Sequence, residues 1–132
     1  PAGSADRVLT FRNVHNWAKA GATEAAFESF FEALKPGGVL GVVEHRAPAG
    51  RPLAEQIESG YMTEAYVIEQ AEKAGFKLEA NASINANLAD DTEHPAGVWT
   101  LPPTLRLGEE NRARYLEIGE SDRMTLRFRK PE

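Results

Sequence analysis

The chain contains no cysteine and no long apolar run, and both absences exclude functions. Without thiols there is no cysteine nucleophile, no zinc–thiolate site and no disulfide, and the compartment stays open because a thiol-free protein is insensitive to redox conditions. No stretch approaches the roughly 18 apolar residues of a membrane-spanning helix, and residues 1–6 lack the pattern of a signal peptide. We therefore expect a chain that is soluble as given and makes no membrane contact.

The start of the chain leaves its location open. It begins with Pro1 instead of methionine and enters an apolar strand almost at once, so we expect further sequence upstream. The cytoplasm is the default location. The periplasm is not excluded, because a targeting segment would lie in that upstream part.

Positive charge is scarce: 15 lysines and arginines stand against 20 acidic residues, for a net charge of -5. Nucleic acid is therefore not expected as a partner, because phosphate binding needs a clustered positive face. The basic residues near the C-terminus follow an alternating pattern, which is typical of a solvated strand face. They are Arg123, Arg127, Arg129 and Lys130. The acidic balance favours a neutral or cationic small molecule as substrate.

The length of 132 residues, of which 42% are hydrophobic, fits one globular domain. Such a chain buries roughly two thirds of its unfolded surface, so its stability gives no argument for a structural metal.

Apolar periodicity predicts a strand, a helix and a second strand in the first third of the chain. Residues 7–11 are a β-prone run, and a helix capped by Thr23 carries an apolar stripe at helical spacing. The stripe consists of Phe27, Phe30, Phe31 and Leu34. Residues 35–38 then form a turn, and residues 39–43 are apolar on both faces, as in a buried parallel strand. A right-handed crossover places the ends of the two strands side by side.

The rest of the chain adds a second helix and two strands. Residues 47–52 are a loop, a helix over residues 63–74 ends at Gly75, and residues 76–84 alternate as a half-exposed strand near an edge. Residues 85–103 form a long surface excursion, followed by a short helix over 109–116 and a last strand over 124–128. The fold class is therefore α/β. The part of the excursion from Asp90 to Trp99 is a candidate lid together with Tyr61 and Tyr66, whose alternative role is packing.

Four segments resemble the second half of class I, Rossmann-like S-adenosylmethionine-dependent methyltransferases. Two are LKPGGVLGVVEH (34–45) and AEKAGFKLEA (71–80), which match the turns into strands five and six of that fold. The other two are VLTFRNVHNW (8–17) and SDRMTLRFRKP (121–131), which resemble a bacterial family of methyltransferases with an Arg-Asn-x-His-Asn-Trp signature after strand four.

The resemblance implies that residues 1–132 supply strands four to seven of a doubly wound sheet, with the last strand antiparallel, as the C-terminal part of a single methyltransferase domain. The cofactor would be S-adenosyl-L-methionine and the acceptor a small molecule. The glycine-rich loop of the family is absent, and Gly37-Gly38 cannot replace it because this pair precedes a strand. A second chain or a homodimer is the expected source of the missing half. The alternative function is a non-catalytic half-domain or fragment that completes its fold with another chain.

The catalytic candidates follow the first two strands, where an open α/β sheet places its site. They are His15 and His45 as general bases and Asn13 as an orienting amide, since an imidazole ordinarily titrates near pH 6.5. The alternatives are a turn-capping role for Asn13 and a loop-carbonyl contact for His15. A hydrolase using either histidine lacks a Gly-x-Ser-x-Gly nucleophile turn.

The remaining candidates are binding residues. Phe11, Arg12, Asn13 and Trp17 are expected to bind the cofactor, and Glu44, Arg46 and Tyr61 the substrate. Core packing is the alternative for Trp17, and an ion pair with each other is the alternative for Arg12 and Glu44. No metal is expected, because no pair of histidines has close ligand spacing.

Overall fold

A four-stranded mixed sheet forms the centre of the computed structural model, which describes residues 1–132. The strands are β1 (Ala5–Phe11), β2 (Leu34–His45), β3 (Lys77–Ala82) and β4 (Arg123–Arg129), in the order β1-β2-β4-β3. β1 is parallel to β2, whereas β4 is antiparallel to both of its neighbours. The predicted α/β class and the antiparallel last strand are confirmed.

The first strand and the second are joined by two helices, α1 (Val14–Ala20) and α2 (Thr23–Ala33). The stripe predicted for α2 buries Phe27 completely. Thr23 is the first helical residue and Ala22 occupies the N-cap position, so the expected Thr23 cap is wrong. No helix was predicted for the residues of α1. It has seven residues, too few to show an apolar period, and Gly21 ends it in the left-handed conformation.

The turn expected at residues 35–38 lies inside β2 as an irregularity. Leu34 pairs with Ala5 and Val39 with Arg7, so the residues between them bulge out of the pairing. A Cβ on Gly38 would lie 2.8 Å from the carbonyl oxygen of Lys35, which makes glycine necessary at this close approach.

Two further helices precede β3, namely α3 (Leu53–Ser59) and α4 (Glu64–Ala74). α4 is confirmed with both of its ends: the Thr63 side chain accepts a hydrogen bond from the Tyr66 N–H at 3.1 Å, and Gly75 takes the left-handed conformation. α3, a seven-residue helix, lies in a stretch for which no helix was predicted.

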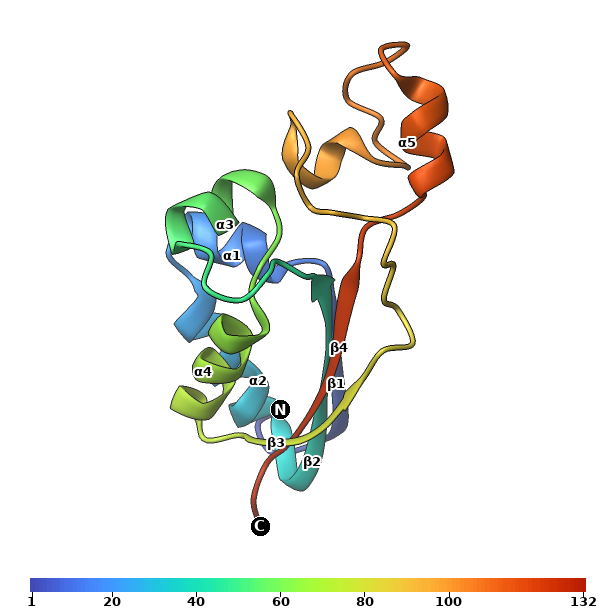
Figure 1. Cartoon of the computed structure of the whole chain (residues 1–132). Helices are drawn as coiled ribbons and strands as arrows, with labels where there is room; N and C mark the ends of the chain where they lie inside the picture. The colour runs from blue at the N-terminus through green and yellow to red at the C-terminus, as the bar shows by residue number, and fades with distance from the viewer.

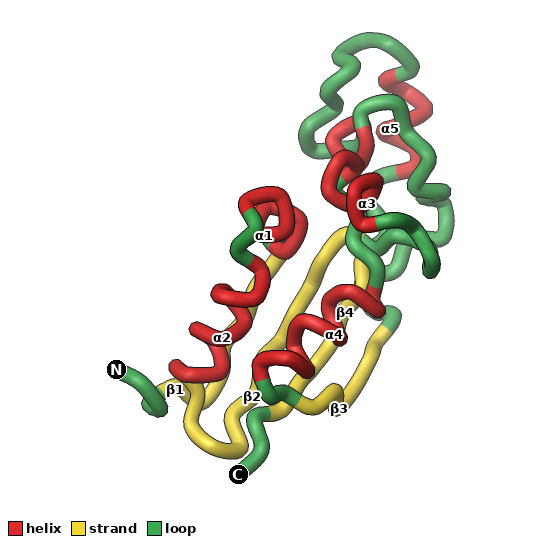
Figure 2. The backbone as a smooth tube through the Cα atoms, turned by 90° about the vertical axis from the view of Figure 1, so that its left-hand side faces the viewer, coloured by secondary structure: helices red, strands yellow, loops and turns green.

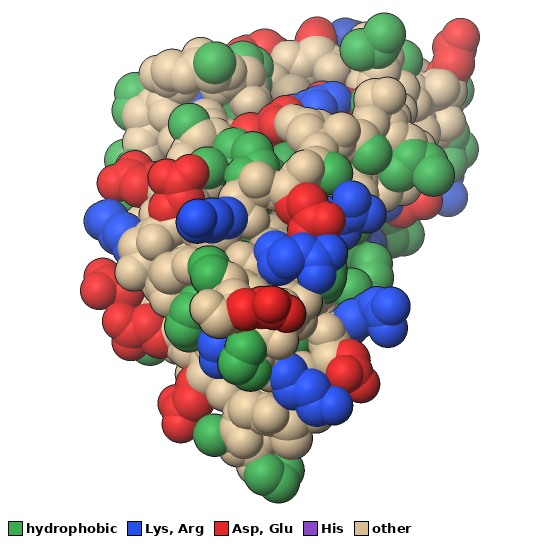
Figure 3. Space-filling view, turned by 90° about the horizontal axis from the view of Figure 1, so that it is seen from below, with side chains coloured by type: hydrophobic (Ala, Val, Ile, Leu, Met, Phe, Trp, Pro, Cys, Tyr) green, Lys and Arg blue, Asp and Glu red, His purple; other side chains and the backbone are tan.

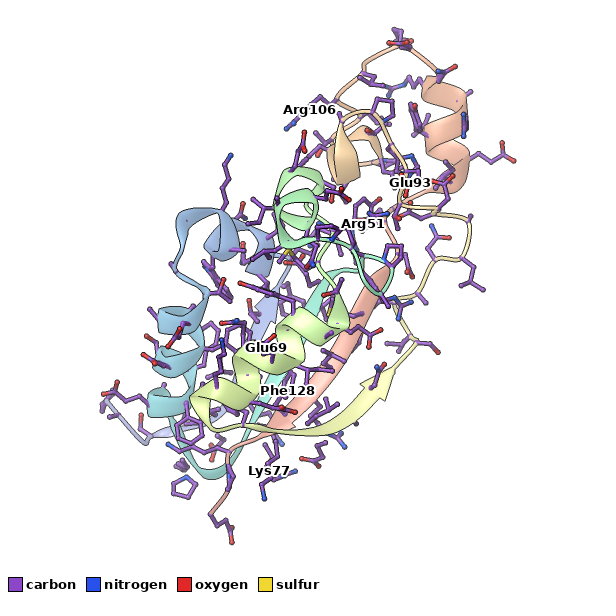
Figure 4. The ribbon with its side chains drawn as sticks, turned by 60° about the vertical axis from the view of Figure 1, so that its left-hand side comes forward. Arg51, Glu69, Lys77, Glu93, Arg106 and Phe128 are labelled. Carbon is purple, nitrogen blue, oxygen red and sulfur yellow. The ribbon has the colours of Figure 1, made fainter.

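The helices α1, α2 and α4 all lie on one face of the sheet (Figures 1 and 2). The core fills the space between them, and Phe128 of β4 lies beneath α4 (Figure 4). This core contains twelve buried residues: Val14, Phe27, Leu34, Leu40, Val42, Met62, Val67, Ala71, Phe76, Met124, Leu126 and Phe128.

The other face of the sheet is not covered by any helix (Figure 1). Leu9 is 61% exposed and Phe11 55% exposed on this face, where they border an apolar hollow of about 370 Å³. A doubly wound sheet carries helices on both faces, so this chain shows only one of the two expected helical layers. The alternation predicted for residues 76–84 is also broken, because the register shifts between Leu78 and Ala80 and the strand ends at Ala82.

The excursion between β3 and β4 stands at one end of the sheet (Figure 1). It contains a 3₁₀ helix, η1 (Gly97–Thr100). A short helix, α5 (Arg112–Ile118), follows it and is shifted from the predicted 109–116. Arg51 and Glu93 face each other in Figure 4 and form an ion pair of 2.7 Å that ties the excursion to the loop before α3. No helix of the chain has both the length and the apolar character needed to cross a membrane.

Candidate active site

A cleft of about 310 Å³ opens where β1 and β2 end, beneath the excursion. This is the position at which open α/β sheets bind ligands, and the volume is at the lower end of the roughly 300–1,000 Å³ that small organic molecules occupy. The lining residues are Phe11, Arg12, Asn13, His15, Asn16, His45, Val98, Trp99, Pro102, Pro103, Thr104, Ser121 and Arg123.

His15 and Glu44 form a buried pair at the floor of this cleft. The His15 Nδ1 atom lies 3.0 and 3.1 Å from the two carboxylate oxygens of Glu44. The same carboxylate accepts the backbone N–H of His15 at 2.9 Å and that of His45 at 2.8 Å. With Glu44 fully buried, these donors hold it in place, and the carboxylate keeps the hydrogen of His15 on Nδ1.

His45 is held by a different partner. Its Nδ1 atom makes a hydrogen bond with the Ser121 hydroxyl, which also accepts a hydrogen bond from Arg123 Nε at 3.1 Å. Burial lowers the pKa of His45 to about 3, and the positive charges of Arg123 and Arg12, together with that of His15 whenever it is protonated, act in the same direction. The ring is therefore neutral at physiological pH. Since the Ser121 hydroxyl has no other acceptor within the protein, we assign its hydrogen to the bond with Nδ1 and the ring hydrogen of His45 to Nε2.

The Nε2 atoms of both histidines reach the cleft. Every fully buried side-chain nitrogen or oxygen of the chain has a hydrogen-bond partner, whereas these two atoms have none within the protein. They are therefore accessible to solvent, and the cleft is the cavity that both rings line. The ring centroids lie 5.4 Å apart. The cleft thus presents a hydrogen-bond acceptor on His15 next to a hydrogen-bond donor on His45.

Arg12 takes the left-handed conformation, with φ of 56°, between β1 and α1. This region is unfavourable for a residue with a Cβ, and such strain is concentrated at functional sites. Its N–H donates to the Val43 carbonyl at 2.7 Å, which fixes the chain at the point where it turns into the cleft.

The structure brings together one group of the residues singled out in the sequence. Phe11, Arg12, Asn13, His15 and His45 all line the cleft. The convergence of the two strand ends therefore follows the sequence expectation.

The other expected residues lie elsewhere. Trp17 packs edge-on against Phe27 in the core, and Glu44 is buried under His15 without lining the cleft. Arg46 is engaged in ion pairs with Asp122 and Glu64 and borders a separate cavity.

Tyr61 is the clearest departure from the expected substrate contact. It is fully buried, and its hydroxyl donates to Asp90 at 2.8 Å. Burial and the adjacent Asp90 carboxylate raise the pKa of Tyr61. The Tyr61 hydroxyl is engaged by Asp90 and so anchors the excursion. Tyr61 is not among the residues that line the cleft.

Several cleft residues escaped the sequence reading. Ser121 and Arg123 flank the start of β4, which is antiparallel to β2 and so begins where β2 ends. The prediction of an antiparallel last strand could have located both residues, because such a strand begins beside the end of β2. Trp99, whose ring lies edge-on to His15 with centroids 5.8 Å apart, comes from the excursion that was considered a lid.

Two groups of side chains have the composition of metal ligands: His15, Glu44 and His45, and Asp90, Asp91 and His94. In the first group each Glu44 oxygen already accepts a backbone N–H. In the second, Asp90 accepts from Tyr61, the Thr92 N–H and the Asp122 N–H. Both carboxylates are thus oriented and satisfied by donors of the chain itself, and both groups form hydrogen-bonded networks.

Comparison with known proteins establishes the fold. No family model matches the chain, and no curated protein matches it in sequence. Among solved structures, the chain is similar to the (4+2)-cyclase SpnF, with 18% identity and a TM-score of 0.63 over 99% of this chain and 52% of that one. It is also similar to an S-adenosylmethionine-dependent methyltransferase from Methanosarcina mazei, with 10% identity and a TM-score of 0.61 over 98% of this chain and 61% of that one.

A third neighbour is phosphoethanolamine N-methyltransferase 2 of Haemonchus contortus, solved in complex with S-adenosyl-L-methionine. It shares 16% identity and a TM-score of 0.57 over 100% of this chain and 34% of that one. The chain therefore has the mixed α/β fold of S-adenosylmethionine-dependent methyltransferases. It spans between about a third and three fifths of the length of these three neighbours. Because one of them is named as a cyclase, the chemistry has to be argued from the cleft.

Proposed function

We propose that this chain forms part of an enzyme that transfers a methyl group from S-adenosyl-L-methionine to an oxygen of a small-molecule acceptor. The observation that carries the proposal is the His15–Glu44 pair, whose free Nε2 atom faces a cleft at the carboxyl ends of two parallel strands. A carboxylate-oriented imidazole with one accessible nitrogen is the usual arrangement of a general base.

The role of each residue follows from its hydrogen bonds. The acceptor hydroxyl gives its proton to His15 Nε2 as the oxygen becomes nucleophilic, and the Glu44 carboxylate stabilises the positive imidazole that results. When bound, the cofactor supplies the methyl group on a positively charged sulfur, which keeps the electron pair of the broken carbon–sulfur bond. His15 then releases the proton to solvent through the cleft. Trp99, edge-on to His15, shields the base from bulk water.

The residues present fit only one border of a cofactor site. Phe11 and Asn13 at the end of β1 offer an aromatic face and an amide to the cofactor. The single strand-to-helix turn at the cleft runs through Arg12 and Asn13 without a glycine, and Gly37-Gly38 lies at the opposite end of β2. Most cofactor contacts would therefore come from a polypeptide segment beside β1.

A radiolabelled methyl-transfer assay tests this function. The purified protein, with any chain that co-purifies, is incubated with methyl-labelled S-adenosylmethionine and a panel of hydroxylated small molecules. Removing a general base lowers rates about 10²–10⁴-fold, so we expect a loss of this size in His15→Gln. His94→Gln is the matched control, because His94 is also paired with a buried carboxylate but lies outside the cleft. Equal rates in wild type and His15→Gln would refute the base assignment.

A second candidate function is a half-domain that completes its fold with another chain or a second copy. The specific observation in its favour is the uncovered sheet face, with Leu9 and Phe11 more than half exposed. Large exposed apolar patches mark interaction surfaces. Native mass spectrometry with and without S-adenosylhomocysteine separates the two candidates. A partner chain without bound ligand favours the half-domain, whereas bound ligand favours the enzyme.

A further inference from the structure

The residues that line the cleft differ in charge from the molecule as a whole. The chain carries a net charge of -5, yet no aspartate or glutamate is among the residues that line the cleft. Arg12 and Arg123 do line it. The end of the molecule seen from below shows both signs interspersed, which is the ordinary pattern of a solvated surface (Figure 3). A lining with two arginines and no acid thus distinguishes the cleft from the end of the molecule that Figure 3 shows.

Two acids, Glu44 and Glu120, lie next to the cleft without lining it. Glu44 is buried beneath His15 and accepts the N–H of His15 and the N–H of His45 in addition to the ring. Glu120, whose side chain is 57% exposed, forms an ion pair of 2.9 Å with Arg123 and offsets part of its charge, but is not among the lining residues. Arg12 is exposed and takes part in none of the ion pairs of the chain.

The histidines add a hydrogen-bonding pattern to this charge. His15 presents an acceptor and His45 a donor, on rings whose centroids are 5.4 Å apart. A ligand whose hydroxyl donates to His15 would place a second group beside His45. That second group has to accept a hydrogen bond, as an oxygen atom can. The two arginines favour negative charge on that second oxygen.

We infer that the cleft binds a small organic anion that carries its carboxylate beside the hydroxyl to be methylated. Arg12, Arg123 and His45 would hold the carboxylate, and His15 would face the hydroxyl. The inference rests on the proposed function for the fate of the hydroxyl, while the preference for an anion rests on the cleft alone. It also reverses the neutral or cationic substrate that the overall charge favours.

Three probes with the same ring and hydroxyl separate charge from shape. They are 2-hydroxybenzoate as the anion, 2-hydroxybenzamide as its neutral analogue and 2-(aminomethyl)phenol as the cation, each titrated into the full chain by NMR without cofactor. We expect the anion to bind at least about tenfold more tightly than the amide, and the cation to bind most weakly. Equal affinities, a preference for the cation, or binding of none of the probes would overturn the inference.

Matched arginine variants locate the effect. Arg12→Gln should lower the affinity for 2-hydroxybenzoate about tenfold and leave that for the amide unchanged. Arg114→Gln removes the same charge from an exposed position on α5 and should change neither. Raising the salt from about 0.05 to about 0.5 M on wild type should weaken only the anion. If Arg114→Gln and Arg12→Gln act alike, or salt has no selective effect, the assignment to the cleft arginines is wrong.

These outcomes are independent of the methyl-transfer assay. A charge preference without methyl transfer leaves the anion site standing and removes the proposed function. Methyl transfer that prefers the amide over the carboxylate leaves the proposed function standing and removes the anion site.

Discussion

Two histidine–carboxylate pairs occur in this chain, and only one of them faces a cleft with the properties of an active site. His15–Glu44 joins the start of α1 to the end of β2, and His94–Asp90 joins residues four apart within the excursion. Both carboxylates are buried and both contacts are close, at 3.0 and 2.7 Å. The pairs differ in their surroundings. His15 opens onto arginines and another histidine, whereas the cavity beside His94 also contains Glu55, Glu58 and Glu93.

The difference shows that a buried imidazole–carboxylate pair does not by itself indicate catalysis. Asp90 also accepts hydrogen bonds from the Tyr61 hydroxyl and from the backbone N–H of Asp122. This pair therefore holds the excursion against the rest of the chain. Glu44 accepts hydrogen bonds only from His15 and His45, which lie at the same end of the sheet. His15 keeps one ring nitrogen that is accessible. One pair is therefore expected to govern stability and the other chemistry.

The largest expected effect comes from the structural pair. Asp90→Asn removes a buried charge that three donors and His94 share, so the free energy of unfolding should fall by about 3–5 kcal/mol. Urea unfolding followed by circular dichroism measures this loss. A change below about 1 kcal/mol would show that Asp90 does not anchor the excursion.

The third histidine extends the comparison to pH. The pKa of His45 is lowered from 6.5 to about 3, chiefly by burial, so between these values the unfolded chain binds more protons than the folded chain. Its contribution to stability is complete above pH 6.5 and is lost as the pH falls toward 3. At about 1.4 kcal/mol per pH unit, this is about 3 kcal/mol between pH 6.5 and pH 4. Unfolding at both pH values should show a correspondingly smaller loss in His45→Gln, and an identical loss in both proteins would contradict the assignment.

The chemical pair is tested by Glu44→Gln in the methyl-transfer assay. Glu44 acts through His15, so kcat should fall about 10²-fold, equivalent to about 2.7 kcal/mol, with little change in KM. The pH profile of kcat should also shift, because the imidazole loses its carboxylate partner. A purely structural role for Glu44 would lower the amount of folded protein and leave the pH profile of the remainder in place.

Tyr61→Phe should produce the smallest effect. It removes one of the bonds to Asp90 and leaves the others, at about 1–2 kcal/mol of unfolding free energy. Affinity of the cleft for 2-hydroxybenzoate should stay unchanged, as measured by NMR titration. Altered affinity would mean that the excursion anchor and the cleft are coupled and that the two pairs are not independent.

Much of this fold could be predicted from sequence because its main elements carry strong local signals. The α4 helix has both an N-cap threonine and a C-terminal glycine, and β2 is apolar on both faces. The crossover between parallel strands then brought His15 and His45 to one edge without further information.

The rest depended on contacts that are distant in sequence. The helices α1 and α3 have seven residues each and so show no full apolar period. Trp17 and Tyr61 are of residue types that occur in binding sites as well as in cores. Only their contacts with Phe27 and Asp90 show that they are packing and anchoring residues. The two arginines of the cleft could not be inferred from net charge, because net charge averages over the surface whereas Arg12 and Arg123 act locally.

The place of β4 in the sheet has a consequence for biosynthesis. β4 lies between β2 and β3 and is the only partner of β3, although it is made after both. As the ribosome releases the chain from its N-terminus, β3 remains unpaired until Arg123 to Arg129 emerge. The sheet can therefore close only after translation of its final strand, and a chain that stalls before this point exposes the edges of both β2 and β3 to aggregation.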